Sequence, residues 1–326
     1  MAITAPSFVS AATVSGLEGI TGTEQRAYHG TTSSIYALPA DAHEYDRLEK
    51  QHRLLLHLFN GPISACAVLP VLDADTGVAS ARVLDVGCGP GSWINLVAAE
   101  HPCVEAHATD FAPTYKPPTD AAVPSRVEFQ LGNVLHKLPY PDNHFDFVQM
   151  RFFTGALKVE EWPEAIAELH RIIKPGGWVQ LVEPDGELRT SAAQGITPAI
   201  RDWNERGMRG SLRKRGGEPN AGVNLAQYAR AAGFQPYSVL AELRTVPLSL
   251  KGVEAAPGNP EQKDHLRRLA SLMIDDYLEL VKTLAPILCQ SWDITPQEMV
   301  SWGERVLRDA EECEAYHGFV TCIAQK

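Results

Sequence analysis

The sequence has 326 residues, of which 44% are hydrophobic and 21% are charged, enough apolar material for one large or two modest globular domains. Its 29 basic and 40 acidic residues give a formal net charge of −11 at pH 7. An acidic surface argues against non-specific binding to nucleic acid and to anionic membranes. The apolar runs also fall far short of the roughly 20 residues that a membrane-spanning helix needs.

The six cysteines form no C-x-x-C pair and have no histidine at zinc-finger spacing. We therefore expect free thiols, a reducing compartment and no bound metal. Neither lysine nor arginine precedes Arg26, so the sequence lacks the charged start of a secretory or mitochondrial targeting segment. These observations predict a cytoplasmic protein.

The first 25 or so residues are rich in Ala, Ser, Thr and Gly, and we expect residues 1–35 to be a disordered tail before one folded domain at 36–326. A helix is predicted from Asp41 to Phe59, because apolar residues recur there at steps of three and four. Asp41 is suited to cap this helix with Glu44 as its capping-box partner. Asn60-Gly61-Pro62 ends it.

Strands and helices then alternate. Strands are predicted at 82–86, 104–108, 127–131, 145–150 and 178–182, with helices at 92–99 and 163–174 between them. Short apolar strands separated by helices are typical of a parallel sheet that is covered on both faces. We therefore predict a doubly wound, Rossmann-like α/β fold.

The pattern loosens after Glu183. Helices are predicted at 224–232, 259–290 and 295–313, and strands at 237–243 and 318–324, which bring the sheet to seven strands. Insertions at about 187–222 and 256–313 are expected to form a helical cap together with the N-terminal helix. The segment 208–220 shows no periodicity. The basic run that begins just before it is interpreted as a solvated, mobile lid or, alternatively, as a mouth that tolerates an anionic substrate. The basic residues concerned are Arg206, Arg209, Arg213, Lys214 and Arg215.

A glycine-rich loop gives the clearest functional signal. Val83-Leu84-Asp85-Val86-Gly87-Cys88-Gly89-Pro90-Gly91 lies between a strand and a helix, where doubly wound sheets bind nucleotides. Its spacing is G-x-G-x-G, which differs from both the dinucleotide fingerprint and the P-loop. Asp110 ends the second strand, where a carboxylate can accept hydrogen bonds from both ribose hydroxyls. Asn133 ends the third strand, where its amide can meet the edge of an adenine.

These motifs together resemble the class I S-adenosylmethionine-dependent methyltransferases. Asp85 and the three glycines are similar to their first motif, and Asp110 is similar to their second-strand acid. The segments 138–148 and 174–177 resemble two further family motifs. More narrowly, the segment from Tyr36 to His52 resembles the N-terminal part of the fungal LaeA-like (UMTA) methyltransferases.

The resemblance implies that S-adenosyl-L-methionine binds and leaves as S-adenosyl-L-homocysteine, with no metal. The cofactor-binding residues that it implies are Tyr36, Asp85, Gly87, Cys88, Gly89, Gly91, Asp110, Phe111, Asn133, Val134 and Arg151. Candidates for a base or for substrate positioning are His52, Arg151 and Glu183, with Asp185 also at the end of the fifth strand. Methyl transfer from a sulfonium is an in-line displacement, so a base is needed only where the nucleophile retains its proton.

Three functions remain open at this point. The first is a methyltransferase acting on O, N or S of a small molecule, with a fungal secondary metabolite as the expected substrate class. The second is a LaeA-like regulator of secondary metabolism that acts within a protein complex. The third is a dehydrogenase-like nucleotide enzyme, which binding of NAD would reveal. The sequence leaves the oligomeric state undetermined.

Overall fold

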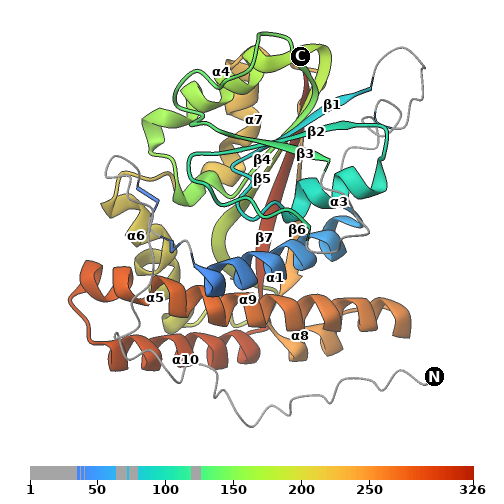
Figure 1. Ribbon diagram of the computed structural model, residues 1–326. Coiled ribbons are helices and arrows are strands. Elements are labelled where there is room, and N and C mark those ends of the chain that lie inside the picture. Colours follow the sequence, from blue (N-terminus) through green and yellow to red (C-terminus); the bar gives the residue numbers. More distant parts are fainter. Residues whose placement is uncertain (1–34, 37, 40, 64–71, 73–79, 119–125) are drawn as a thin grey trace.

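The computed structural model describes residues 35–36, 38–39, 41–63, 72, 80–118 and 126–326 (Figure 1). The tail predicted at 1–35 therefore lies outside the described residues, apart from Ile35. A seven-stranded sheet with strand order β3-β2-β1-β4-β5-β7-β6 forms the centre of the fold. Its strands are β1 (Arg82–Val86), β2 (Glu105–Asp110), β3 (Val127–Leu131), β4 (Phe145–Arg151), β5 (Ile173–Thr190), β6 (Leu240–Pro247) and β7 (Ala315–Gln325).

The first five strands are mutually parallel, whereas β7 runs antiparallel to both β5 and β6. Successive side chains of a strand point to opposite faces of the sheet. Val83 accordingly packs with α3 (Ser92–Glu100), and Leu84 packs with α4 (Trp162–Ile172) and α7 (Ala221–Ala231). Helices thus cover both faces of the sheet, and the predicted doubly wound class is confirmed.

A layer of helices lies across the edge of the sheet that contains the carboxyl ends of β4 and β5 (Figure 1). It contains α1 (Ala42–Phe59), α5 (Pro198–Arg206), α6 (Met208–Lys214), α8 (Leu250–Ala255), α9 (Pro260–Trp292) and α10 (Pro296–Glu312). The layer has its own apolar core, which includes Trp203, Tyr277 and Trp302 and reaches the sheet at Phe319. Apart from α8, these helices come from the segments predicted to form the cap. The assignment of a cap and the domain boundaries remain predictions.

Two helix starts follow the sequence signals. Asp41 caps α1 as predicted and accepts a hydrogen bond from the Glu44 amide at 3.0 Å. Glu44 does not act as the expected capping-box partner, because its carboxylate binds Arg47. Thr295 and Glu298 form the predicted capping box at the start of α10. Local chemistry therefore sets where these helices begin.

Three elements differ from the expected ones. β5 has 18 residues, far longer than the predicted 178–182, because β7 pairs along it on both sides of a bulge between Pro184 and Leu188. α8 was not predicted. β6 begins at Leu240, three residues later than expected, where its pairing with β7 starts. Strand pairing over long sequence separations decided both strand boundaries.

The mobile-lid interpretation of segment 208–220 is wrong. Residues 208–214 form α6, which packs between α5 and α9, and Arg209 is buried with an ion pair to Glu187 at 2.9 Å. Lys214 lies over the ring of Trp292, 3.5 Å from its centroid. Tertiary contacts therefore order a segment whose sequence lacks helical periodicity.

Two features of the described residues concern membrane spans and metal binding. Within these residues, the helices all lack the combination of length and apolarity that would carry them across a bilayer. The same part of the chain holds no cluster of three or more His, Cys, Asp or Glu side chains arranged to bind a metal ion.

Candidate active site

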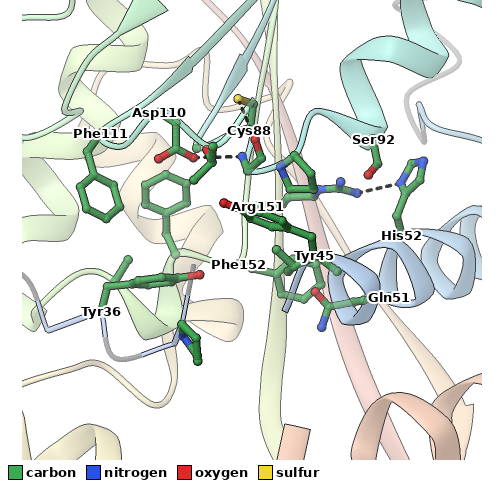
Figure 2. A pocket seen from close by; sticks show the side chains of 18 residues that line it. Tyr36, Tyr45, Gln51, His52, Cys88, Ser92, Asp110, Phe111, Arg151 and Phe152 are labelled. Carbon is green, nitrogen blue, oxygen red and sulfur yellow. Dashed lines mark hydrogen bonds between the residues drawn. The ribbon is translucent and has the colours of Figure 1, made fainter. Parts of the chain in front are cut away.

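The glycine loop forms one wall of a pocket between the sheet and α1 (Figure 2). Gly87, Gly89 and Gly91 have φ values of 67°, 53° and 88°, a region that residues with a Cβ rarely adopt. A Cβ on Gly87 would lie 2.5 Å from the ring of Phe153, and one on Gly91 would lie 2.6 Å from the ring of Tyr115. The loop therefore needs glycine for its conformation and for the close approach of these two rings.

Asp110 fixes the loop and lines the pocket. Its Oδ2 accepts a hydrogen bond from the Gly89 amide at 2.9 Å, and its Oδ1 accepts one from the Ala112 amide at 3.1 Å. Each carboxylate oxygen has a second lone pair that can accept from a ligand hydroxyl. Asp110 is therefore placed to bind a diol while it holds Gly89 in position.

Aromatic rings flank Asp110. Tyr36 and Phe111 meet edge to face with centroids 6.1 Å apart, and both line the pocket. In Figure 2 these rings and Asp110 lie at one side of the pocket, whereas Arg151 and His52 lie towards the other. Apolar rings beside a diol-binding acid suit a nucleoside.

Arg151 and His52 join β4 to α1 across the pocket, with Arg151 Nη1 3.2 Å from His52 Nδ1. Burial, followed by the charge of Arg151, lowers the pKa of His52 to about 3. The imidazole is thus neutral at physiological pH, so Nδ1 accepts from the guanidinium and Nε2 carries the proton. His52 consequently orients Arg151, and its basic nitrogen is already engaged.

Asp85 belongs to β1, just before the glycine loop, and does not itself line the pocket. It is 1% exposed, and among the described residues neither carboxylate oxygen has a hydrogen-bond partner. Burial raises the pKa of Asp85 to about 7, although the charge of Arg151 acts to lower it. A ligand that carries both a cation and a carboxylate would match this pair of residues, with its cation near Asp85 and its carboxylate at Arg151.

Glu183 is fully buried but does not line the pocket. Its carboxylate accepts hydrogen bonds from the Phe153 amide at 2.6 Å and from the Thr154 amide and hydroxyl at 3.0 and 2.6 Å. Burial raises the pKa of Glu183 to about 7, while these hydrogen bonds act to lower it. The side chain therefore holds the turn after β4 and has no free access to a substrate.

Other expected cofactor residues are also placed away from the pocket lining. Asn133 Oδ1 accepts from the Leu135 amide at 3.0 Å, and Val134 is buried in the core beside α4. Asp185 is buried and paired with Arg189. Of the expected set, those that line the pocket are Tyr36, His52, Gly87, Cys88, Gly89, Asp110, Phe111 and Arg151.

Sequence reasoning missed several lining residues. Tyr45, Leu48 and Gln51 project from α1 into the pocket, whereas the recurrence of apolar residues at steps of three and four predicts only the helix itself. Phe152 follows β4 with a φ of 61°, in the left-handed region. No sequence motif marks Phe152, because its role comes from the sharp turn that Glu183 stabilises.

A second pocket adjoins the first. Its walls include residues of α1, α5, α6, α9, β5 and β7 and are mainly apolar, with Trp203, Met273 and Phe319 among them. The two pockets share four residues at their junction, which are Tyr36, Leu48, Gln51 and Phe152. The geometry therefore provides a nucleoside-shaped site that opens into a largely apolar chamber.

Comparisons with known proteins fit this arrangement. Residues 83–177 match the family described as "Methyltransferase domain". Methyltransferase pytC of Aspergillus terreus is 24% identical over 305 residues, covering 92% of this chain and 86% of that protein. The secondary metabolism regulator laeA of Coprinopsis cinerea is 27% identical over 274 residues, or 82% of this chain and 63% of that protein.

Residues 83–177 therefore match a methyltransferase domain, and the chain as a whole is similar to fungal proteins named as a methyltransferase and as a regulator of secondary metabolism. The recognition made from the sequence motifs is thereby confirmed. Among solved structures, a SAM-dependent methyltransferase from Archaeoglobus fulgidus aligns with a TM-score of 0.45 and 13% identity, covering 86% of this chain and 99% of that one.

Proposed function

We propose that this methyltransferase uses S-adenosyl-L-methionine and transfers its methyl group to a small molecule. The observation that carries the proposal is the junction of the two pockets. Tyr36, Leu48, Gln51 and Phe152 line both, so a ligand in the loop-side pocket meets a ligand in the apolar chamber at these residues. Such a mainly apolar chamber suits a small organic acceptor.

The residues present fit the donor. Asp110 would accept from the ribose hydroxyls, with Tyr36 and Phe111 beside the adenosine. Arg151 would bind the carboxylate of the methionine portion, and Asp85 would offset its ammonium. When bound, the donor supplies an electrophilic methyl group on a positively charged sulfur.

The chain's own task is then to align the reactants and to exclude water. α1 and α9 cover the junction, and Phe152 and Leu48 present apolar surface there. Tyr36 is the only ionisable side chain at the junction among the described residues, and burial, followed by the charge of Glu44, raises its pKa. A strong base is therefore missing from the described junction, and the acceptor should lose its proton readily, as a thiol, carboxylic acid or acidic phenol does.

The regulator laeA of Coprinopsis cinerea supports a second candidate, a regulatory methyltransferase that acts in a protein complex. This candidate would place the acceptor on a macromolecule. The chamber favours the small-molecule candidate, because helices of the cap surround it. A cytoplasmic location remains a prediction from the sequence.

Methyl-labelled S-adenosylmethionine distinguishes the candidates. The purified protein is incubated with cell extract separated into small-molecule and macromolecular fractions, and label is followed in each. We expect label in an organic-soluble product that mass spectrometry then identifies. Label confined to the macromolecular fraction would favour the regulatory candidate, and binding of NAD instead of S-adenosylhomocysteine would reject both.

The affinity for S-adenosylhomocysteine should rise with pH. The Asp85 carboxyl has a pKa of about 7 in the free protein, so it is mostly neutral at pH 6 and mostly ionised at pH 8. If its anion offsets the ligand ammonium, affinity follows the ionised fraction and increases by up to about tenfold over this interval. Calorimetric titration at pH 6, 7 and 8 measures the change.

Asp85→Asn provides the control, since an amide has the same shape but does not titrate. The variant should bind with a pH-independent affinity. If the pH dependence persists unchanged in Asp85→Asn, it comes from a different group. Glu183 is then the first group to test, because burial raises its pKa to about 7 as well.

A further inference from the structure

Apart from Arg215, the charged or titratable side chains described at the apolar chamber carry no excess positive charge. Arg47, which lines the chamber, forms ion pairs with Asp276 at 3.1 Å and with Glu44 at 2.7 Å. His317 also lines the chamber, but burial, followed by the charge of Arg189, lowers its pKa to about 4, so it is neutral. Neither group offers net positive charge to a ligand.

Arg215 is different. It lines the chamber just after α6, where its Nη1 donates to the Ile35 carbonyl at 2.8 Å and its Nε donates to the Ser211 carbonyl at 3.2 Å. Among the described residues no carboxylate forms an ion pair with it. Burial lowers the pKa of Arg215, and no neighbouring acid counters this effect. The guanidinium nevertheless stays charged, because its ordinary pKa is far above neutrality.

A half-buried cation with only carbonyl partners has no opposite charge beside it. Two of its five N–H groups are engaged by the carbonyls, which leaves three, including both on Nη2. Two N–H groups in a planar fork fit a carboxylate. A phosphate dianion would call for a second unmatched cation, and the Arg47 charge is already countered.

We propose that Arg215 recognises the acceptor, and that the acceptor is a lipophilic small molecule carrying one carboxylate. The proposal rests on the proposed function, since it assigns the chamber to the acceptor. The carboxylate would pair with Arg215, and the hydrocarbon or aromatic body would pack against side chains such as Trp203, Met273 and Leu284. An acid also agrees with the absence of a strong base among the described junction residues, whether the methyl group goes to the carboxylate or to another acidic atom.

The test compares acids with their neutral amides. The probes are 2-naphthoate, biphenyl-4-carboxylate and decanoate, each paired with its primary amide, titrated into the protein by calorimetry with and without saturating S-adenosylhomocysteine. At least one acid should bind about tenfold more tightly than its amide, as expected for a charge-assisted hydrogen-bonded pair. Arg215→Gln should bring that ratio close to one, and Arg215→Lys should keep part of it.

Arg213→Gln is the matched control. Arg213 lies two residues away, is paired with Glu205 at 3.3 Å, is 47% exposed and does not line the chamber. This variant should keep the preference for the acid, and all variants should have similar melting temperatures. The proposal is overturned if no acid binds more tightly than its amide, or if Arg215→Gln retains the preference.

The same titrations distinguish failure of the proposed function from failure of the Arg215 proposal. If S-adenosylhomocysteine does not bind, the donor assignment fails, while the titrations without it still report whether Arg215 selects a carboxylate. If S-adenosylhomocysteine binds but the acid preference is absent, the donor assignment stands and the acceptor assignment is rejected.

Discussion

Replacing Asp110 by alanine should weaken S-adenosylhomocysteine binding by more than tenfold. The substitution removes the acceptor of the ribose hydroxyls and also the acceptor of the Gly89 amide, 2.9 Å away. Hydrogen bonds to a charged group contribute about 1.5–3 kcal/mol each, so the loss of even one ligand contact exceeds a tenfold change. Isothermal titration calorimetry measures the affinity directly.

Two comparisons make this prediction specific. Glu128→Ala removes an acid whose side chain is 61% exposed on the neighbouring β3, and it should leave the affinity unchanged. Asp110→Asn keeps the volume but presents an NH₂ group towards one of the backbone donors, so it should bind almost as weakly as the alanine variant. An Asp110→Ala affinity within threefold of the wild type would rule out the ribose assignment.

The sequence was informative where function and structure depend on local chemistry. The three glycines, Asp110 and the Asp41 and Thr295 caps act within a few residues of the chain or at a strand end, and the structure places each as expected. Periodicity likewise located α9 to within two residues of its observed end at Trp292. These features follow from backbone conformation and hydrogen bonding that a short segment determines.

Features that depend on distant contacts were not predictable in this way. β5 extends to Thr190 because β7 pairs with it, and α6 is ordered by α5 and α9. Glu183 appeared suited to catalysis from its place at a strand end, yet its carboxylate is occupied by Phe153 and Thr154. The acceptor chamber draws residues from several helices and strands that are far apart in the sequence, so no single stretch of sequence predicts it.

Breaking the buried charge cluster between α1 and α9 should have the largest effect on stability. Arg47 is 3% exposed and binds Glu44 through Nε and Nη2, and Asp276 through Nη1. Although burial acts to lower the pKa of Arg47, the two carboxylates raise it overall. Arg47→Met would leave two buried carboxylates without their cation, a change that costs about 3–5 kcal/mol of unfolding free energy.

Denaturant unfolding of the Arg47→Met variant at two pH values tests both the size and the cause of the loss. Unpaired buried carboxylates have raised pKa values, so their penalty grows as pH rises above those of the unfolded chain. The deficit relative to the wild type should therefore be larger at pH 8 than at pH 5. Arg53→Met, which removes an exposed partner of Glu49 on the same helix, should cost no more than about 0.5 kcal/mol.

A deficit below about 1 kcal/mol, or one that does not depend on pH, would contradict the cluster's proposed role. Adding Asp276→Asn to Arg47→Met should restore part of the lost stability, since it removes one of the two unmatched charges. Gln51 donates to Asp276 at 3.3 Å and lines both pockets, so the same ion pair also holds the junction at which the donor and the acceptor meet. Methyl transfer by the variant should accordingly fall even at temperatures where it remains folded.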